Sequence, residues 1–542
     1  MACNRPLYGT ILGWLCIWVL IPEPGVSARK FYPDDPLAKE PPPANADKVV
    51  PRRISDAYDL FSNILLQRGE QKGKVGVVPA RAVNTLGEVP DSAWYTNRHY
   101  RHPMTIEELV RGPGDQNPPD TSGPLTVVSA KTEGITPGFV MEDARGRRYQ
   151  VKFDPVSNPE MATGADVIVS KFFHALGYNV PENYLFTFTR SQLRLSPSAT
   201  VRTAEGKRRR MTERDLIEIF LKVPKKNGRY RAVASLSLKG KNVGEFRYHG
   251  TRTDDPNDLV PHEHRRDLRG MSVFCAWLGH DDSRAINTLD MLVEESGVQV
   301  VKHYLIDFGS TLGSASTGPN SPRSGQYLFA WKPAVAEFAS LGLYVPRWAR
   351  AHYPKIPAVG RFEAEVFDPE TWVPEYRNPA LRNRLPDDAF WAAKQVMAFT
   401  DEQIRALVKT GQYTDPRAES WIADCLIKRR DKIGQAFFAK ALPLDRFEVR
   451  DGRLTFEDLA VKHKLMASRN YTVQWSRFSN DTEQKSLIPG EQTLALPHLL
   501  QQAAEGEYFA ADIAARDAQK AVVVYLRKEA AGFKVVGIDR TW

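Results

Sequence analysis

Cysteine is scarce in this sequence. The 542 residues include four cysteines, and two of them, Cys3 and Cys16, fall within the first 28 residues. Cys275 and Cys425 remain, each in apolar surroundings typical of a helix, which favours two buried thiols over a bridge. The spacing excludes a disulfide framework and a Cys/His zinc site. A chain of this length can be stabilised by its hydrophobic core alone.

Long hydrophobic runs are scarce as well. The apolar stretch over residues 8–21 is short for a membrane span, and it follows the basic residue Arg5. The small residues Val26, Ser27 and Ala28 then fit a cleavage site. These features predict a signal peptide over residues 1–28 and an exported protein, either periplasmic or secreted. An uncleaved N-terminal membrane anchor is the alternative interpretation.

Neither sign of charge dominates. Lys and Arg number 74 and Asp and Glu number 65, which gives a formal net charge of +9. We interpret this excess as spread along the chain, which favours anionic partners, such as an anionic envelope surface, and provides no specific signal for nucleic acid. The basic run at residues 207–210 is interpreted as a solvated loop.

Internal repeats are absent, and composition changes divide the chain. Residues 29–120 are predicted to form a Pro-rich tether over residues 29–55 and an N-terminal extension, with a short amphipathic helix over residues 54–66. Residues 121–245 favour strands. Residues 246–442 favour helices, which are expected at residues 262–279, 387–399 and 416–440 and after a capping box of Thr400 and Gln403. Residues 443–542 contain an Asp-Gly turn and several strand patterns, typical of a small α+β domain. The expected fold class is α+β.

The strand-rich segment begins with a predicted hairpin. Strands are expected at residues 125–130, 139–142 and 147–154, with a Gly-containing turn before the second. In the third strand Lys152 alternates with apolar neighbours, so it points to the face opposite them. A helix with an apolar stripe is expected over residues 157–177, and further strands at residues 184–189 and 231–238, separated by a polar insertion.

Polar side chains interrupt two apolar regions of the helical segment. The stretch GHDDSRAINTL, residues 279–289, fits the pattern H-x-D-x-x-x-x-N with His280, Asp282 and Asn287. A strand, a turn and a second strand are predicted next, and they lead into Asp307-Phe308-Gly309. Each motif alone is weak, but their order after the hairpin lysine is informative.

This order resembles that of the protein-kinase-like superfamily. The lead-in Trp277-Leu278-Gly279-His280 is more similar to atypical branches, such as the HipA-type, CotH-type and phosphoinositide kinases. The resemblance spans residues 121–442. It implies a two-lobed kinase-like fold, with residues 121–245 as the N-lobe and 246–442 as the C-lobe. It also implies ATP and Mg²⁺ as cofactors, with Mn²⁺ as the alternative metal.

The resemblance also implies roles for individual residues. Asp282 corresponds to the catalytic base that orients the acceptor hydroxyl. Asn287 and Asp307 correspond to the metal ligands, and Lys152 to the cation that neutralises the α- and β-phosphates.

Gly134 and Gly138 belong to the turn expected over the nucleotide. An acid on the following helix should hold Lys152. Asp166 is favoured for that position because it flanks the apolar stripe, and Glu160 is the alternative.

Several positions depart from the family pattern. The turn has two glycines rather than G-x-G-x-x-G, and Pro137 lacks an N–H that could bind phosphate. Asp281 stands where an arginine is usual, and a Ser/Gly-rich run follows Gly309 without an A-P-E motif. The acceptor therefore stays open between a protein, a glycan and a small molecule.

The favoured function is an exported phosphotransferase that moves the ATP γ-phosphate to a hydroxyl acceptor. A pseudokinase without turnover and a nucleotide-binding envelope scaffold are the alternatives. Transfer of another group, such as AMP, is a further option on this fold.

Overall fold

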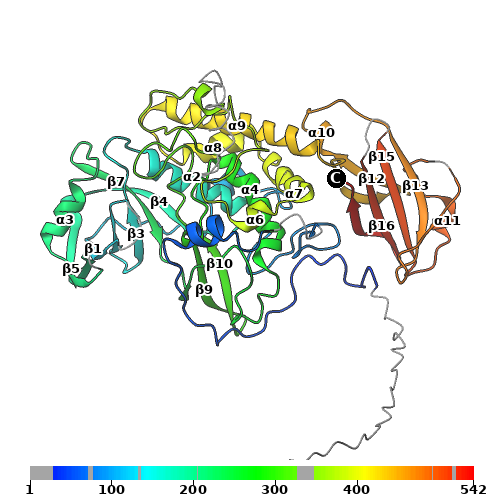
Figure 1. Cartoon of the computed structure of the whole chain (residues 1–542), viewed down its shortest axis with the longest axis horizontal. Helices are drawn as coiled ribbons and strands as arrows, with labels where there is room; N and C mark the ends of the chain where they lie inside the picture. The colour runs from blue at the N-terminus through cyan, green and yellow to red at the C-terminus, as the bar shows by residue number, and fades with distance from the viewer. Residues whose placement is uncertain are drawn as a thin grey trace, which may run out of the picture.

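The computed structural model describes residues 29–70, 77–131, 136–203, 206–325, 347–490, 492–515 and 520–542. The predicted signal peptide, its anchor alternative and Gly134 lie outside these residues. Within the described part of the chain, no helix combines the length and apolar content needed to cross a membrane. Figure 1 shows a sheet-rich unit, a central helical unit and a separate small domain arranged along the long axis. The fold is thus mixed α+β, as the sequence predicts.

The sheet-rich unit is built on seven strands in the order β4-β7-β3-β2-β1-β5-β6. Neighbouring strands are antiparallel except for the parallel pair β1 and β5. The strand bounds are β1 Leu125–Ala130, β2 Gly138–Glu142, β3 Arg148–Lys152, β4 Asn183–Thr189, β5 Leu193–Arg202, β6 Arg208–Arg210 and β7 Arg229–Leu236.

Alternating apolar residues explain this sheet. Phe139, Tyr149, Val151 and Phe153 are buried in one cluster, while Lys152 points to the other side. The predicted hairpin is therefore confirmed. The expectation of a polar insertion after β4 was incomplete, because it contains β5, β6 and helix α3 (Glu213–Phe220), with η2 (Arg190–Gln192) at its start. The many charged residues of this insertion obscure the alternation of apolar residues that would indicate strands.

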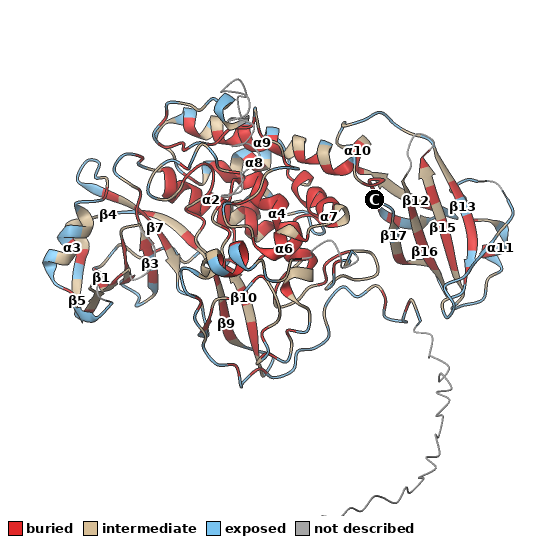
Figure 2. Cartoon of the chain, in the orientation of Figure 1, coloured by how far each residue is buried: buried red, intermediate tan, exposed pale blue. Residues whose placement is uncertain are grey.

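The central unit consists of buried helices (Figure 2). Thr400 and Gln403 form the predicted capping box of α8. The predicted helices at residues 262–279, 387–399 and 416–440 correspond to α4, α7 and α9. The bounds are α1 Ile106–Arg111, α2 Met161–Ala175, α4 Arg266–Leu278, α6 Pro379–Arg382, α7 Pro386–Met397, α8 Asp401–Lys409 and α9 Pro416–Phe438, with short 3₁₀ turns η3 His262–His264, η4 Ala285–Asn287 and η5 Arg347–Arg350.

A three-stranded sheet projects from the helical unit. It consists of β8 (Lys241–Gly244), β9 (Thr288–Glu295) and β10 (Val298–Leu305), and β9 and β10 form the hairpin predicted between the two polar motifs. This hairpin places Asn287 immediately before β9 and Asp307 shortly after β10. The two motifs thus come from the two ends of one hairpin.

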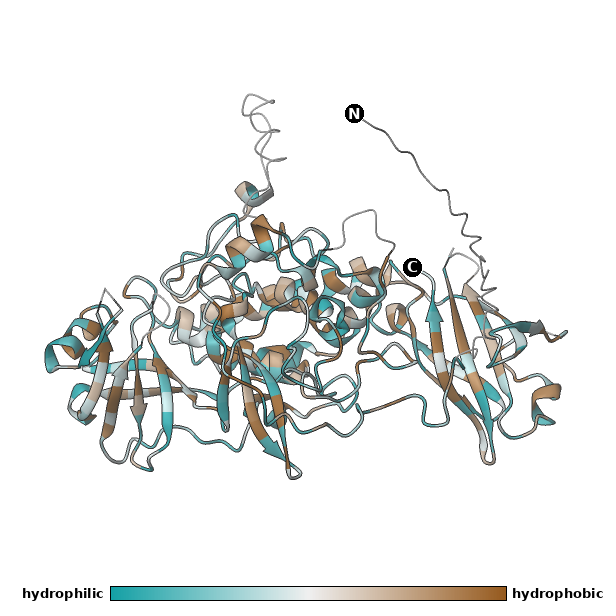
Figure 3. Ribbon diagram, turned by 60° about the horizontal axis from the view of Figure 1, so that its bottom comes forward, coloured by the Kyte–Doolittle hydropathy of each residue, from teal (hydrophilic) through white to brown (hydrophobic). Residues whose placement is uncertain are grey.

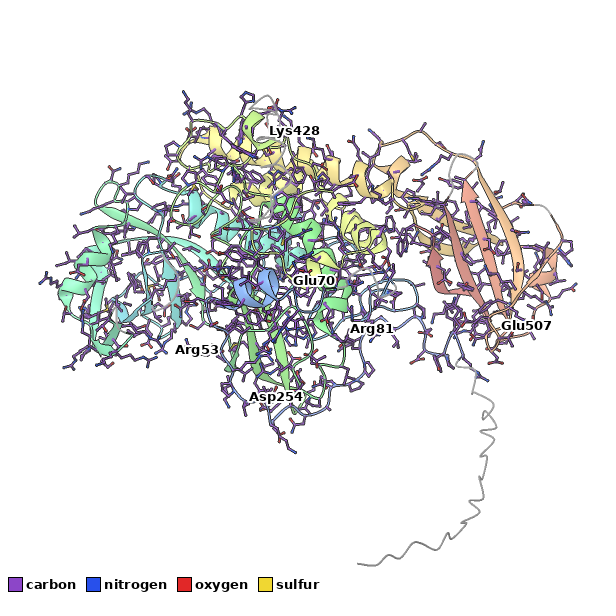
Figure 4. The ribbon with its side chains drawn as sticks, in the orientation of Figure 1. Arg53, Glu70, Arg81, Asp254, Lys428 and Glu507 are labelled. Carbon is purple, nitrogen blue, oxygen red and sulfur yellow. The ribbon has the colours of Figure 1, made fainter. Side chains whose placement is uncertain are left out.

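The N-terminal extension packs on the folded units. Ala46 and Val49 are buried against Val243, Leu292 and Val301 of the three-stranded sheet. A π-helix, η1 (Asp59–Leu65), lies where the sequence predicts a helix. The carboxylate of Glu70, labelled in Figure 4, pairs with Arg382 of α6. The prediction of a tether for residues 29–55 is therefore corrected, because apolar residues between the prolines anchor this segment.

The C-terminal domain holds a five-stranded antiparallel sheet in the order β14-β13-β15-β16-β17 and a two-stranded hairpin. The domain also contacts the helical unit through a buried charge network, in which Lys394 of α7 donates to Glu88 and, at 2.9 Å, to Asp445. The bounds are β11 Leu444–Arg450, β12 Arg453–Asp458, α10 Leu459–Lys462, β13 Tyr471–Phe478, β14 Lys485–Leu487, α11 His498–Gln501, β15 Tyr508–Ala515, β16 Ala521–Glu529 and β17 Gly532–Arg540.

Candidate active site

Lys152 lies at the centre of the site. It is the last residue of β3, and its side chain is 15% exposed. The ammonium group donates to Asp166 Oδ2 at 3.0 Å and to Asp307 Oδ1 at 2.9 Å. Burial alone would lower the pKa of Lys152, but the charges of the two carboxylates outweigh it and raise the pKa. The lysine therefore stays charged and connects the sheet-rich unit to the helical unit.

Asp166 belongs to α2 and is almost completely buried. Besides Lys152, it accepts from Asn183 Nδ2 at 2.8 Å and from the Phe308 backbone N–H at 3.4 Å. Such a buried carboxylate is stable only with several donors. Asp166 thus joins β3, α2, the start of β4 and the turn after β10.

Glu160, the alternative acid, points elsewhere. It occupies the N-cap position of α2 in the left-handed region, with φ of 71°. Its carboxylate accepts from the Thr414 N–H at 2.7 Å and from the Thr414 hydroxyl. Lys152 thus forms its ion pairs with Asp166 and Asp307 and not with Glu160. The alternative is corrected because the first turn of α2 faces the loop after α8.

Asp307 follows β10 and adopts a left-handed backbone, with φ of 62°. Few residues other than glycine tolerate this conformation, and in proteins it gathers at functional turns. Burial alone would raise the pKa of Asp307, but the charges of Lys152 and Lys131 outweigh it and lower the pKa to about 2. Because Oδ1 accepts from Lys152, Oδ2 is the oxygen suited to a metal ion.

The loop after α4, residues 279–287, carries Asp282 and Asn287 and is called the catalytic loop after its predicted role. Gly279 ends the helix in the left-handed region, with φ of 62°. Asn287 Nδ2 donates to the Asp282 carbonyl at 2.7 Å, and Arg284 Nε donates to Asp282 Oδ1 at 2.5 Å. The hydrogen bond from the Asn287 side-chain amide fixes the loop and leaves the Asn287 Oδ1 pointing away from the Asp282 carbonyl.

The carboxylate of Asp282 is about one-third exposed. Burial raises its pKa, although Arg284 acts in the opposite direction. A raised pKa makes this carboxylate a better proton acceptor at neutral pH.

His280 is a buried residue next to the site. It packs against Phe173 of α2 and Phe308, with ring centroids 5.8 and 5.9 Å away. Burial lowers its pKa to about 4, so the ring is neutral at pH 7. The contact joins the catalytic loop to α2 and to the turn that carries Asp307.

The glycine turn is described only in part. Gly138 lies opposite Lys152 in the β2–β3 ladder, and a Cβ at Gly138 would lie 2.3 Å from the Val151 carbonyl oxygen. The close approach of two strands therefore explains this glycine. Its predicted role toward a nucleotide stays a prediction.

Sequence reasoning missed two residues beside the site. Lys131 follows β1, donates from Nζ to the Thr136 hydroxyl at 2.6 Å, and contributes positive charge to Asp307. Asp59 of η1 is buried and accepts from the Ala285 N–H of the catalytic loop at 3.2 Å. The basic residue after a predicted strand was a usable signal for Lys131. Asp59 had none, because it is far away in sequence.

The donor set fits a magnesium ion held jointly with phosphates. Among the described residues, no group of three or more His, Cys, Asp or Glu side chains could hold a metal. Mg²⁺ commonly takes one or two protein oxygens and completes its shell with phosphates and water. Asp307 Oδ2 and Asn287 Oδ1 can provide these two oxygens.

The sequence matches no family model and no curated protein. Solved structures give distant matches, among them CtkA, a proinflammatory kinase of Helicobacter pylori. It has 12% identity over 56% of this chain and 95% of that chain, with a TM-score of 0.30.

Two further matches are the Golgi casein kinase and hydra Fam20. The Golgi casein kinase with Mn and ADP bound has 8% identity, covering 58% of this chain and 74% of that chain, with a TM-score of 0.28. Hydra Fam20 with sugar has 10% identity, covering 59% of this chain and 87% of that chain, with a TM-score of 0.31. At these low values, the contacts within this chain, and not the similarities, support the proposal below.

Proposed function

We propose that this protein is a kinase-like phosphotransferase that moves the ATP γ-phosphate to a hydroxyl acceptor. The observation that supports the proposal best is the position of Lys152, whose ammonium lies 3.0 Å from Asp166 and 2.9 Å from Asp307. A buried cation held beside a metal-binding carboxylate is an arrangement suited to a triphosphate. Asp282 and Asn287 lie on the adjoining loop.

The proposed step is an in-line displacement. The acceptor oxygen forms a bond to the γ-phosphorus, the bond from that phosphorus to the β,γ-bridging oxygen breaks, and ADP leaves. Asp282 takes the proton of the hydroxyl. Lys152 binds the α- and β-phosphates and holds them in position for the transfer. Asn287 and Asp307 would hold Mg²⁺, or Mn²⁺, which supplies charge neutralisation when bound.

The acceptor is proposed to be a hydroxyl of a protein, a glycan or a small molecule outside the cytoplasm. Support for export comes from the basic residue, apolar stretch and small-residue site at residues 1–28. A pseudokinase is the second candidate, and the observation that favours it is the 2.5 Å ion pair between Arg284 and Asp282. This ion pair occupies Oδ1 of Asp282, so that oxygen is not free to accept the proton of a hydroxyl acceptor.

Two substitutions separate these roles. We expect Asp307→Ala to abolish the thermal stabilisation of the protein by Mg-ATP, because it removes the metal-binding carboxylate. Asp282→Asn should keep that stabilisation but lose transfer by about 10²- to 10⁴-fold, because the amide cannot accept the proton. Melting temperature with and without Mg-ATP and incorporation of labelled phosphate measure the two effects.

Glu160→Gln is the matched control, since Glu160 lies on the same helix as Asp166 but faces Thr414. It should leave both readouts unchanged. If the parent is stabilised by Mg-ATP but transfers no phosphate to any acceptor class, the pseudokinase is correct. If the parent shows no response to Mg-ATP at all, the proposal is wrong and an envelope scaffold that binds no nucleotide replaces it.

A further inference from the structure

Residues 190–229 carry most of the net charge of the chain. They hold 12 Lys and Arg and 4 Asp and Glu, so their net charge of +8 accounts for most of the formal net charge of +9. The expectation that the charge is spread along the chain is therefore wrong. The described part of this segment, residues 190–203 and 206–229, is called the basic cap here and includes β5, β6 and α3 at one end of the molecule (Figure 1). Figure 3 shows that this end is largely hydrophilic.

The three acidic residues of the basic cap that the structure describes are already paired. Asp215 pairs with Arg209 at 2.5 Å, Glu218 with Arg214 at 3.4 Å, and Glu213 with Arg190. Among the described residues, no carboxylate forms an ion pair with the other exposed cations of the cap, which are Arg194, Lys207, Arg208, Arg210, Lys222, Lys225, Lys226 and Arg229.

The β5–β6 ladder adds a second sign of an external anion. Arg202 lies directly opposite Arg208. Like charges at facing positions of two strands repel each other and destabilise the pair. In addition, Arg202 Nε is buried and has no hydrogen-bond partner in the described structure. An anion on this edge would relieve the repulsion between the two guanidinium groups.

Helix α3 exposes aliphatic side chains on the same cap. Ile217 is 53% exposed and Leu221 is 77% exposed, and their spacing of four residues places them on one face. The opposite face is anchored by Leu216, which is buried in the core of the sheet. The cap therefore presents two protruding apolar side chains surrounded by unpaired positive charge.

We infer that the basic cap is a docking surface for an anionic lipid bilayer. Lysine and arginine are attracted to the negative surface of such a membrane, and short aliphatic groups can enter its interface. A soluble polyanion such as nucleic acid or a sulfated glycan would engage the cations but would leave Ile217 and Leu221 in water. The lipid surface explains both features. The inference does not depend on the proposed phosphotransfer.

Vesicle binding tests the inference. The chain from Arg29 onward, which contains all described elements, is floated with vesicles of phosphatidylcholine and phosphatidylglycerol in equal parts, and separately with phosphatidylcholine alone. We expect binding to the anionic vesicles only, weakened by added salt. Heparin provides the comparison with a soluble polyanion.

Three variants assign the binding to the cap. The first is a triple variant that combines Lys207→Ser, Arg208→Ser and Lys222→Ser. It should weaken vesicle binding about 100-fold, since each cation contributes about fivefold. Ile217→Ser with Leu221→Ser should weaken vesicle binding on the order of 10-fold and leave heparin binding unchanged.

Lys409→Ser, Arg453→Ser and Lys464→Ser form the control, because these exposed cations lie outside the cap. The control should bind vesicles like the parent. If the parent ignores anionic vesicles, or if the control loses as much binding as the cap variant, the inference is overturned. It is equally overturned if the two serines at positions 217 and 221 leave vesicle affinity unchanged, because the cap would then be a polyanion site.

Discussion

Asp281 is a buried carboxyl group in the middle of the catalytic loop. It accepts from the Glu375 N–H at 2.7 Å and from Asn320 Nδ2 at 3.4 Å, and so anchors the segment after Gly309. Burial raises its pKa to about 7, although these hydrogen bonds act in the opposite direction. Between about pH 4 and pH 7 the folded protein therefore holds a proton that the unfolded chain has lost. The contribution of Asp281 to the free energy of unfolding therefore decreases as pH rises through that window.

Asp281→Asn should remove this pH dependence. We expect the variant to gain stability relative to the parent as pH rises from 4 to 8, by up to about 4 kcal/mol, because the amide bears no charge to bury. The melting temperatures of both proteins at several pH values measure the gain. Asp56→Asn, at an exposed position, is the control. An equal difference between variant and parent at pH 4 and pH 8 would contradict the prediction.

At the scale of elements, the N-terminal extension supports the catalytic loop. Asp59 of η1 accepts from the Ala285 N–H at 3.2 Å and from Asn63 Nδ2 at 2.8 Å. Ala285 begins η4, between the proposed base Asp282 and the proposed metal ligand Asn287. Burial raises the pKa of Asp59 to about 6. A hydrogen bond from outside both lobes thus fixes the centre of the loop.

Asp59→Ala should reduce turnover by about 10-fold with little change in the apparent affinity for Mg-ATP, because the unsatisfied Ala285 N–H loosens the loop. Asp59→Asn keeps an acceptor oxygen and should restore most of the rate. Steady-state kinetics with kcat and KM determined separately provide the measurement. Asp56→Ala on the same segment should behave like the parent. Equal rates for Asp59→Ala and the parent would show that the extension does not position the loop.

At the scale of the whole molecule, the extension connects the C-terminal domain to the rest. Phe31 is 2% exposed and packs in a cluster with Phe478, Ala510, Tyr525 and Val536. Lys30 donates to Asp539 Oδ2 at 2.7 Å, on the same sheet. The chain then continues to Ala46 and Val49, which are buried against the three-stranded sheet.

Phe31→Ala should therefore destabilise the C-terminal domain by about 3–5 kcal/mol, the usual range for removing a buried aromatic ring. Hydrogen exchange should accelerate in β13, β15 and β16, while the response to Mg-ATP stays unchanged. Tyr32→Ala is the control, because Tyr32 is 52% exposed. Unchanged exchange in these strands would mean that the domain is stable without the extension.

Local patterns in the sequence determined much of the fold. Strand patterns predicted β1, β2, β3 and β7, an apolar stripe predicted α2, and a capping box predicted α8. The H-x-D-x-x-x-x-N pattern and Asp307 were equally visible, because their spacing within one hairpin is short. These features depend on neighbours along the chain, so the chain alone reveals them.

Only the tertiary structure decided which acid faces Lys152, because Asp166 and Glu160 lie on one helix and differ only in direction. Likewise, only packing brought Asp59 to the catalytic loop and Phe31 to the C-terminal sheet. Such contacts join segments distant in sequence. Their energy comes from the burial and charge that three-dimensional proximity creates, and no local pattern encodes it.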